Sequence, residues 1–269
     1  MRWIRKDVTA KDGVIYFVPL GDFHCGAAEF TATAEEKLRG YLEWILEKPN
    51  AFTFLMGDLL NCATTSSAGR PFEEILGATD QFIKIKRLLE PLAHTGRVLG
   101  SLIGNHEYQL LKSTGSKLNR ALELCEALGI DYAGAACYLS LNVSRSKTQR
   151  TTWDLFLSHG FGGGRRRGAK VNNLEQLALI CEADVYCSGH VHDCLPFRAY
   201  RWSHNKNRLQ RRKVAFTTSG SFLDYSQTDQ DKPSEAYSER LAFAPVEIGA
   251  PRIRLSADEN GKKDIHISI

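Results

Sequence analysis

Side chains that commonly bind divalent metal ions recur along this 269-residue chain in five short motifs. The motifs are Gly21-Asp22-Phe23-His24, Gly57-Asp58, Gly104-Asn105-His106-Glu107, Ser158-His159-Gly160 and Gly189-His190-Val191-His192. They combine imidazole nitrogens with carboxylate and amide oxygens, a mixture that suits manganese, iron or zinc better than calcium. In a site with two cations about 3.5–4 Å apart, both ions act on the same phosphoryl group. These side chains could therefore hold two divalent metal ions that act together on a phosphoester.

Each motif directly follows an apolar run that is typical of a buried β-strand. The runs are Val14–Leu20, Ala51–Met56, Val98–Ile103, Thr152–Ser158 and Asp184–Ser188. Ligands of open α/β sheets bind beyond the carboxyl ends of the strands. We therefore expect loops that are distant in the sequence to bring the motifs together at one end of a sheet. The glycines of the motifs would let the backbone approach the metal ions closely.

Outside the motifs, the spacing of apolar residues predicts a first part of the chain in which strands and helices alternate and a second part that is rich in strands. Helices are predicted over Thr33–Glu47 (with Thr33 and Glu36 as a capping box), within Phe72–Leu92, over Lys117–Leu128 (with Gly129 as C-cap) and from Asn172 or Asn173 to Cys181. Hairpins are predicted for Cys137–Val143 with Thr152–Ser158, Leu195–Trp202 with Lys213–Thr218, and the two strands around Asn260-Gly261. No repeat or long linker interrupts this pattern, so we expect one α/β domain over residues 1–269.

The composition is ordinary for a soluble globular protein, with 43% apolar and 25% charged residues. No apolar run is long enough to span a bilayer, and the N-terminus lacks the apolar core of a signal peptide. The seven cysteines include no Cys-x-x-Cys pair. We therefore expect reduced thiols, a cytoplasmic location and no contact with a membrane.

The five motifs resemble those of the calcineurin-like metallophosphoesterase superfamily, whose pattern is D-x-H, G-D, G-N-H-D/E, H and G-H-x-H. The resemblance extends from Gly21 to His192. It implies the metallo-dependent phosphatase fold, a four-layer α/β/β/α sandwich of two mixed sheets flanked by helices. It also implies a hydrolase with two divalent metal ions, Mn²⁺ before Fe, Zn or Ni, in which a hydroxide that bridges the ions attacks the phosphoester.

The resemblance also assigns roles to individual side chains. It implies that the first metal ion is held by Asp22, His24 and His192, that the second is held by Asn105, His159 and His190, and that Asp58 bridges both. His106 corresponds to a histidine that contacts the scissile phosphate and protonates the leaving group. The partner that orients His106 stays unassigned, although Asn61 is placed to form a hydrogen bond with it.

Two clusters of basic residues indicate a polyanionic substrate. Arg165, Arg166 and Arg167 end a glycine-rich loop that begins at His159 and does not have P-loop spacing. Its glycines allow close approach to phosphate, and its arginines offer bidentate contacts. The second cluster lies between Leu195 and Val214, where there is no Asp or Glu, and consists of Arg198, Arg201, Lys206, Arg208, Arg211, Arg212 and Lys213. Tyr200 and Trp202 interleave with it and could stack on bases.

We therefore predict a phosphodiesterase, and specifically a nuclease acting on DNA or RNA. The residues expected to contact this substrate are Asn105, His106, Arg165, Arg166 and Arg167. The surroundings of the motifs also resemble the DNA-repair exonuclease-like branch of the superfamily and its phage and bacterial relatives. Such nucleases work with an ATPase, so a separate ATPase chain and a homodimer are further expectations.

Three other functions compete with the nuclease. A small-molecule phosphoesterase, cleaving a cyclic nucleotide or a nucleotide monoester, would use the same metal centre. A protein phosphatase is disfavoured because Gly57-Asp58-Leu59-Leu60-Asn61-Cys62 lacks the second Asp and the Arg of G-D-x-V-D-R-G. A non-catalytic scaffold is disfavoured because no ligand of the resembling pattern is missing.

Overall fold

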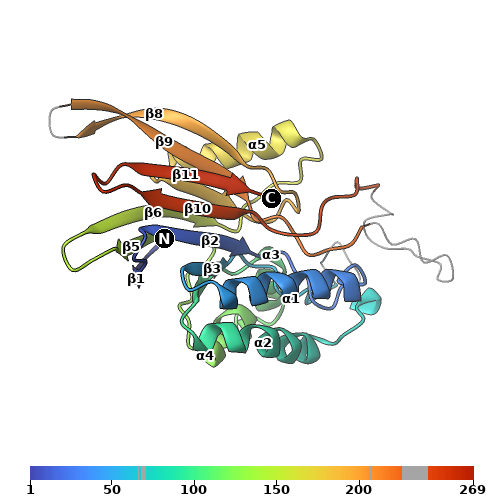
Figure 1. Ribbon diagram of the computed structural model, residues 1–269. Helices are drawn as coiled ribbons and strands as arrows, with labels where there is room; N and C mark the ends of the chain where they lie inside the picture. The colour runs from blue at the N-terminus through green and yellow to red at the C-terminus, as the bar shows by residue number, and fades with distance from the viewer. Residues whose placement is uncertain (66, 68–70, 206–207, 226–241) are drawn as a thin grey trace.

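The computed structural model describes residues 1–65, 67, 71–205, 208–225 and 242–269, and two β-sheets organise this part of the chain. One sheet has six strands in the order β1-β5-β6-β7-β9-β8, and the other has five in the order β11-β10-β2-β3-β4. Both sheets contain parallel and antiparallel pairs. Figure 1 shows the strands of both sheets running side by side, with helices on the outer faces.

The five-stranded sheet carries the first three motifs at the ends of its parallel strands. Its strands are β2 (Val14–Leu20), β3 (Ala51–Leu55), β4 (Val98–Ser101), β10 (Arg252–Ala257) and β11 (Lys263–Ser268). Because β2, β3 and β4 are parallel neighbours, their carboxyl ends lie at the same edge of the sheet. All five residues of β3 are buried, as expected for a parallel strand that is covered on both faces.

The six-stranded sheet carries the last two motifs. Its strands are β1 (Arg2–Thr9), β5 (Ala136–Ser144), β6 (Arg150–Ser158), β7 (Val185–Ser188), β8 (Phe197–Asn205) and β9 (Arg208–Thr218). Strands β6, β7 and β9 are parallel neighbours. The residues that directly follow them are His159, Gly189 and Ser219.

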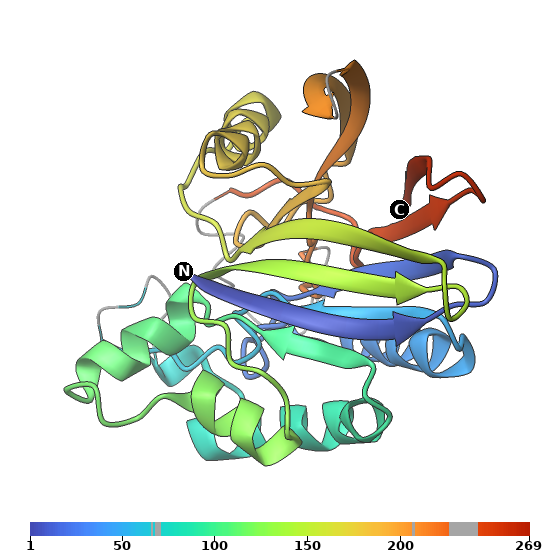
Figure 2. The ribbon, with the colours of Figure 1, turned by 90° about the vertical axis from the view of Figure 1, so that its left-hand side faces the viewer.

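Helices cover the outer face of each sheet. They are α1 (Ala32–Glu47), α2 (Ala78–His94), α3 (Asn105–Ser113), α4 (Arg120–Leu128) and α5 (Arg167–Gln176), with 3-10 turns at η1 (Pro71–Glu73) and η2 (Leu177–Leu179). Helices α1, α2 and α4 pack on the five-stranded sheet, whereas α5 packs on β7 and β9 (Figure 2). The predicted α/β fold with two mixed sheets flanked by helices is confirmed.

Apolar side chains fill three layers between these elements. The layer between the two sheets joins Phe17, Phe54 and Ile253 of one sheet to residues such as Leu155 and Val185 of the other. A second layer lies beneath α1, α2 and α4, and a smaller one lies beneath α5. The buried sheets therefore form a rigid base for the loops at the carboxyl ends of the strands.

Several elements differ from the sequence-based prediction. Helix α3 was not predicted, and α4 begins at Arg120 rather than Lys117. Helix α1 begins at Ala32 because Thr31, not Thr33, is the N-cap, and its hydroxyl accepts from the N–H of Ala34 (3.1 Å). Helix α5 was predicted from Asn172 or Asn173 but begins at Arg167, where no capping side chain signals its start. Strand β1, whose burial alternates only weakly, was not predicted and pairs in parallel with β5.

The hairpin of β8 and β9 is longer than predicted. Strand β9 has 11 residues, but only Ala215–Thr218 pair with β7. The preceding residues pair with β8 alone, so the hairpin extends beyond the sheet as a two-stranded ribbon, seen at the upper left of Figure 1. We call residues 198–205 and 208–214 the hairpin arm. Lys206, which belongs to the predicted basic cluster, lies outside the described residues.

All seven cysteines are free thiols. No helix within the described residues is both long and apolar enough to cross a bilayer.

Candidate metal centre

The side chains of the five motifs converge where the parallel strands of both sheets end. Metal-ligating atoms lie within 4.8 Å of one another in three overlapping groups. The groups are Asp22, His24 and His192; His24, Asp58 and His106; and Asp58, His159 and His190. The first group is one of the two ligand sets that the resemblance implies. The third contains His159 and His190 of the other set together with Asp58, the expected link between the sets.

The first group places two imidazoles and a carboxylate face to face. The Nε2 atoms of His24 and His192 are 3.0 Å apart, and His192 Nε2 is 3.4 Å from Asp22 Oδ1. Asp22 is fully buried, and its carboxylate accepts from the N–H of His190 (2.9 Å) and the hydroxyl of Ser219 (3.0 Å). These two bonds fix the carboxylate so that its oxygen faces the imidazoles.

The other ligand set, Asn105, His159 and His190, gathers around the side-chain oxygen of Asn105. His159 Nε2 lies 2.9 Å from this oxygen, and His190 Nδ1 lies 2.7 Å from it. The other ring nitrogen of His159, Nδ1, donates to the carbonyl of Met56 (2.8 Å). A carbonyl only accepts hydrogen bonds, so this contact places a proton on Nδ1 and directs Nε2 toward the centre.

Asp58 lies between the two ligand sets, and its carboxylate gives the strongest indication of bound cations. Its Oδ2 atom is 3.2 Å from His159 Nε2 and 3.7 Å from His24 Nε2. This oxygen is buried and accepts no well-directed hydrogen bond from the described residues. A buried carboxylate oxygen without such a partner is costly unless it is paired with a cation. The donor set and this oxygen fit two divalent metal ions.

Burial and neighbouring charges shift the pKa values of the side chains at this centre. Burial lowers the pKa of His24 and of His190, and neighbouring histidines lower both further. Burial alone would lower the pKa of His159 too, but the carboxylate of Asp58 raises it to about 10. Burial would raise the pKa of Asp58, yet His159 and His106 hold it well below its usual range. A metal ion would therefore replace a proton on His159 when it binds.

The loops reach this arrangement through an uncommon backbone conformation. Five of the candidate ligands have φ values between 47° and 72°, namely Asp22, His24, Asp58, His190 and His192. Residues other than glycine rarely adopt this left-handed region, and such strain concentrates at functional sites. The turns direct Asp22 and His24 of one motif, and His190 and His192 of another, toward the same centre.

Glycine is required at position 104 for lack of space, although its φ of −88° is ordinary. A Cβ atom at Gly104 would lie 2.0 Å from Asp58 Oδ1 and 2.2 Å from the Asp58 nitrogen. Any side chain would therefore displace the linking carboxylate. The motif glycines were predicted to let the backbone approach the metal ions, whereas Gly104 lets the backbone approach the carboxylate of Asp58.

A comparison with protein-family profiles matches residues 16–194 to the calcineurin-like phosphoesterases. The chain belongs to this family. The match covers about two thirds of the chain and contains all five motifs. Calcineurin-like phosphoesterases are metal-dependent hydrolases with a dinuclear centre, so the two ligand groups have the number and chemistry that the family requires.

Comparison with solved structures finds a similarity to the NAD nucleotidase (NadN) of Haemophilus influenzae. The similarity covers 94% of this chain and 49% of that chain, with 11% sequence identity and a TM-score of 0.43. The chain thus spans about half the length of that protein. No curated protein matches the chain.

Glu107 holds two motifs of this calcineurin-like phosphoesterase together. Its buried carboxylate accepts from the N–H groups of Asp58 (3.1 Å), Leu59 (2.7 Å), Leu60 (3.0 Å) and Gly104 (3.1 Å). Burial, with the nearby charge of Asp58, raises the pKa of Glu107 to about 7. The sequence pattern contained Glu107, but nothing in it indicated that the side chain organises the loop of Asp58.

His106 lies beside the first ligand group, with its ring 4.5 Å from that of His24. Its Nδ1 donates to the backbone carbonyl of Asn61 (2.7 Å). Asn61 is therefore the orienting residue, but through its carbonyl; its side chain instead donates to Glu74 (3.1 Å). This contact leaves Nε2 of His106 available to a substrate.

Tyr225 contributes to the centre from outside the family match. Its hydroxyl lies 2.6 Å from Nδ1 of His192. With Nε2 facing the other ligands, Nδ1 of His192 carries the proton and donates to the hydroxyl. The ring of Tyr225 stacks on Phe243 at 6.4 Å, and Arg165 lies 5.5 Å above the Phe243 ring. No motif or periodicity in the sequence indicated Tyr225.

We expect Tyr225→Phe to weaken metal binding by about 10- to 100-fold, the usual effect of losing a residue that orients a ligand. The ring and its stacking on Phe243 are kept, whereas the hydroxyl contact with His192 is lost. Isothermal titration with Mn²⁺ measures the change. Tyr108→Phe, at an exposed tyrosine of α3, is the control. Equal affinities for the two variants would contradict the orienting role.

The predicted arginine loop lies next to the ligand loop that ends at His192. The buried carboxylate of Asp193 pairs with Arg167 (3.5 Å) and Lys170 (3.3 Å). Arg165 lies above the ring of Phe243, which stacks on Tyr225, and Tyr225 contacts His192. Arg165, Arg166 and Arg167 are all exposed. Two independent contacts thus place this loop beside the first ligand group.

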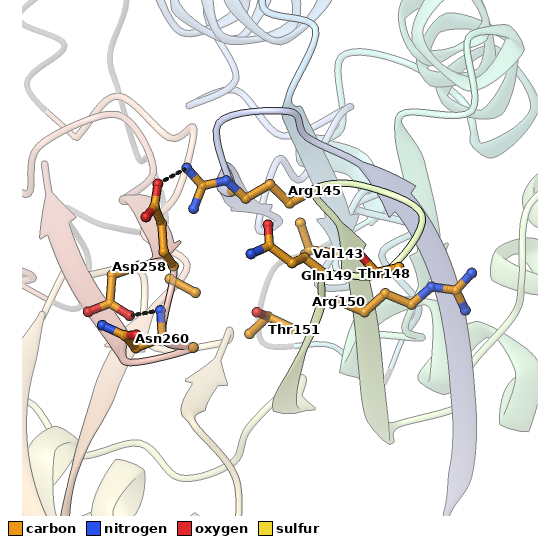
Figure 3. A pocket seen from close by; sticks show the side chains of 12 residues that line it. Val143, Arg145, Thr148, Gln149, Arg150, Thr151, Asp258 and Asn260 are labelled. Atoms are coloured by element: carbon orange, nitrogen blue, oxygen red, sulfur yellow. Dashed lines mark hydrogen bonds and ion pairs between the residues drawn. The ribbon is translucent and has the colours of Figure 1, made fainter.

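A recess of about 260 Å³ lies at the other end of the sheets (Figure 3). It is formed by the β5–β6 and β10–β11 turns and by Gly13, which precedes β2. Arg145 and Glu259 form an ion pair across it at 3.9 Å. Since the candidate ligands follow the carboxyl end of β2, this recess is separate from the metal centre.

Proposed function

We propose that the chain hydrolyses phosphodiester bonds of DNA or RNA at a centre of two divalent metal ions, with Mn²⁺ as the preferred ion. The observation that carries this proposal is the position of the arginine loop beside the metal centre. Arg165 stacks on Phe243 next to Tyr225, and Arg167 pairs with Asp193, which directly follows His192. A substrate with several phosphates could contact this loop while one phosphate occupies the centre.

The residues that would hold the ions fall into the two groups described above. Asp22, His24 and His192 would hold one ion, Asn105, His159 and His190 the other, and Asp58 both. When bound, the ions supply a nucleophilic water at neutral pH and neutralise the charge that develops on the phosphoryl oxygens. Glu107 keeps Asp58 in place through its contacts with the backbone.

His106 supplies the proton that the leaving group needs. The carbonyl of Asn61 holds its Nδ1, so the ring is oriented and Nε2 faces the space next to His24. General acid catalysis by an oriented histidine contributes about 10²- to 10⁴-fold. An alkoxide leaving group, as in a nucleic acid, depends on this proton more than a nitrophenolate does.

The arginine loop would bind the phosphates that flank the scissile bond. Guanidinium groups form bidentate hydrogen bonds with phosphate oxygens, and these are stronger than contacts between neutral groups. The loop also contains Gly160 and Gly162, which have φ values of 93° and 94°. Side chains would be strained at these positions.

Neutralising the loop tests the proposal. We expect the Arg165→Gln, Arg166→Gln and Arg167→Gln triple variant to raise KM for an oligonucleotide at least about tenfold and to lower the slope of log affinity against log salt by about 2 to 3. Turnover of bis(p-nitrophenyl) phosphate should stay unchanged, because it presents no flanking phosphates. Unaltered oligonucleotide binding would remove the loop from the substrate site.

The matched control removes the same charge elsewhere on the surface, by Arg5→Gln, Arg87→Gln and Arg254→Gln. These three side chains are exposed. The substrate class itself is decided by comparing oligonucleotides with cyclic nucleotides, nucleotide monoesters and mono(p-nitrophenyl) phosphate. Hydrolysis of the small substrates alone would exclude the nuclease and support a small-molecule phosphoesterase. A homodimer and a separate ATPase chain stay proposals for this protein.

A further inference from the structure

We propose that the hairpin arm is a second nucleic-acid contact of this protein, on which the bases of a single strand stack while arginines contact its phosphates. This inference rests on the proposed function and extends it to a surface away from the metal ions. It depends on the exposure of the arm, the distribution of its charges and its connection to the metal centre.

One face of the arm exposes large apolar side chains that nothing in the described structure covers. Tyr200, Trp202 and Leu209 are 57%, 69% and 65% exposed. Tyr200 and Trp202 alternate along β8 with residues of the other face, and Trp202 lies opposite Arg211 on β9. Residues opposite each other on paired strands point to the same side, so these groups share one face. A grouped apolar surface of this kind marks a binding site.

The basic residues of the hairpin divide into those that stabilise the fold and those that do not. Arg212 pairs with Glu182 (2.6 Å) and with the buried Asp184 (2.8 Å), and Lys213 pairs with Asp264. Arg201, on the other face, donates to the carbonyl of Ala178 (3.4 Å). These contacts account for part of the basic cluster without any ligand.

Arg198 and Arg211 are different. Both are exposed, and neither forms an ion pair with a described residue. They lie on the face that carries Tyr200 and Trp202, and the guanidinium of Arg211 lies 4.5 Å above the Tyr200 ring. The segment from Leu195 to Val214 contains no carboxylate. Asp264, the carboxylate near Tyr200, pairs with Lys213, which lies opposite Tyr200. The alternating aromatic and cationic groups that remain match the alternating bases and phosphates of a nucleic acid.

Strand β9 connects this face directly to the metal centre. It ends at Thr218, and the hydroxyl of the next residue, Ser219, donates to Asp22 (3.0 Å). Arg211 precedes Ser219 along the same extended chain, which corresponds to about 26 Å at roughly 3.3 Å per residue. A strand cleaved at the centre could thus reach the arm with nucleotides several positions from the scissile bond.

A single strand fits this face better than a duplex, because its bases are free to stack on aromatic rings. We therefore expect Tyr200→Ala with Trp202→Ala to lower the affinity for a single-stranded oligonucleotide of about 12 nucleotides by tenfold or more, and to leave the affinity for a dinucleotide unchanged. Fluorescence anisotropy in the His106→Ala background, where hydrolysis is slow, measures both. Arg198→Gln with Arg211→Gln should lower the salt slope by about 1.4.

The matched control is Trp3→Ala. Trp3 is 59% exposed on β1, at the opposite edge of the same sheet, and carries Arg5 3.6 Å above its ring. It should leave oligonucleotide affinity unchanged. In chains that keep His106, the arm and control substitutions should each leave the turnover of bis(p-nitrophenyl) phosphate at the parent value, which shows that each variant is folded.

The possible outcomes separate this inference from the proposed function. Oligonucleotide cleavage with equal affinities for parent and arm variants would overturn the arm as a contact but leave the nuclease. A parent protein that neither binds nor cleaves oligonucleotides would overturn both. A dimer in solution that Trp202→Ala dissociates, without any change in oligonucleotide affinity, would show that the arm binds a second copy of the chain instead.

Discussion

Replacing His106 with alanine should leave both metal ions bound and lower the turnover of an unactivated phosphodiester by about 10²- to 10⁴-fold. His106 is held by the carbonyl of Asn61 through Nδ1, and none of the contacts of Asn105, His159 or His190 depends on its ring. The loss should be much smaller for bis(p-nitrophenyl) phosphate, because nitrophenolate leaves without a proton. Steady-state kinetics with the two substrates, together with metal analysis of the purified variant, measures these effects.

His94→Ala is the control for this variant. His94 is an exposed histidine in the last turn of α2, so its removal should change neither substrate's turnover. A fall in metal content that parallels the fall in turnover would show that His106 is a ligand. The grouping of His106 with His24 and Asp58 makes that measurement necessary.

Asp58→Asn should have the largest effect of any single change, because Asp58 lies between the two ligand groups. The amide keeps the size of the side chain and the hydrogen bond from the N–H of His106 (2.9 Å) but removes the negative charge. The ions supply several kcal/mol of transition-state stabilisation, so weakened binding at both positions should lower turnover by about 10³-fold or more. The metal content should fall below two ions per chain.

Asp80→Asn makes the same chemical change at the exposed start of α2 and should leave metal content and activity intact. Calorimetric titration with Mn²⁺ gives the stoichiometry for both variants. Two bound ions with unchanged affinity in Asp58→Asn would show that Asp58 does not link the ions. The assignment of the whole centre would then have to be revised.

The metal centre could be predicted from the sequence because its ligands follow buried strands. Runs such as Val14–Leu20 and Ala51–Met56 mark parallel strands, and the carboxyl ends of parallel strands meet at one edge. Since Asp22 and Asp58 each follow such a strand, the sequence alone predicts that they lie close together. Helix ends with a strong local signal were predicted equally well, as for Gly129, which has a φ of 66°.

The parts that the sequence did not reveal depend on contacts between distant residues. Tyr225 is recognisable only once the fold brings its hydroxyl to His192, 33 residues away in the chain. Strand β1 has little periodicity of its own and is fixed by its pairing with β5. Arg212 was predicted to be part of a ligand-binding surface. In the structure it forms ion pairs with Asp184 and Glu182.

The region matched to the family ends at residue 194, yet the architecture does not end there. Strand β10 pairs with β2, β9 pairs with β7, and Ser219 holds Asp22. A fragment that ended at the boundary of the match would leave β2 and β7 each without one of its two neighbouring strands, and Asp22 without the hydrogen bond from Ser219. Anyone designing a minimal version of this hydrolase, or fusing it to another domain, should preserve the segment through β11 as an inseparable part of the folding unit.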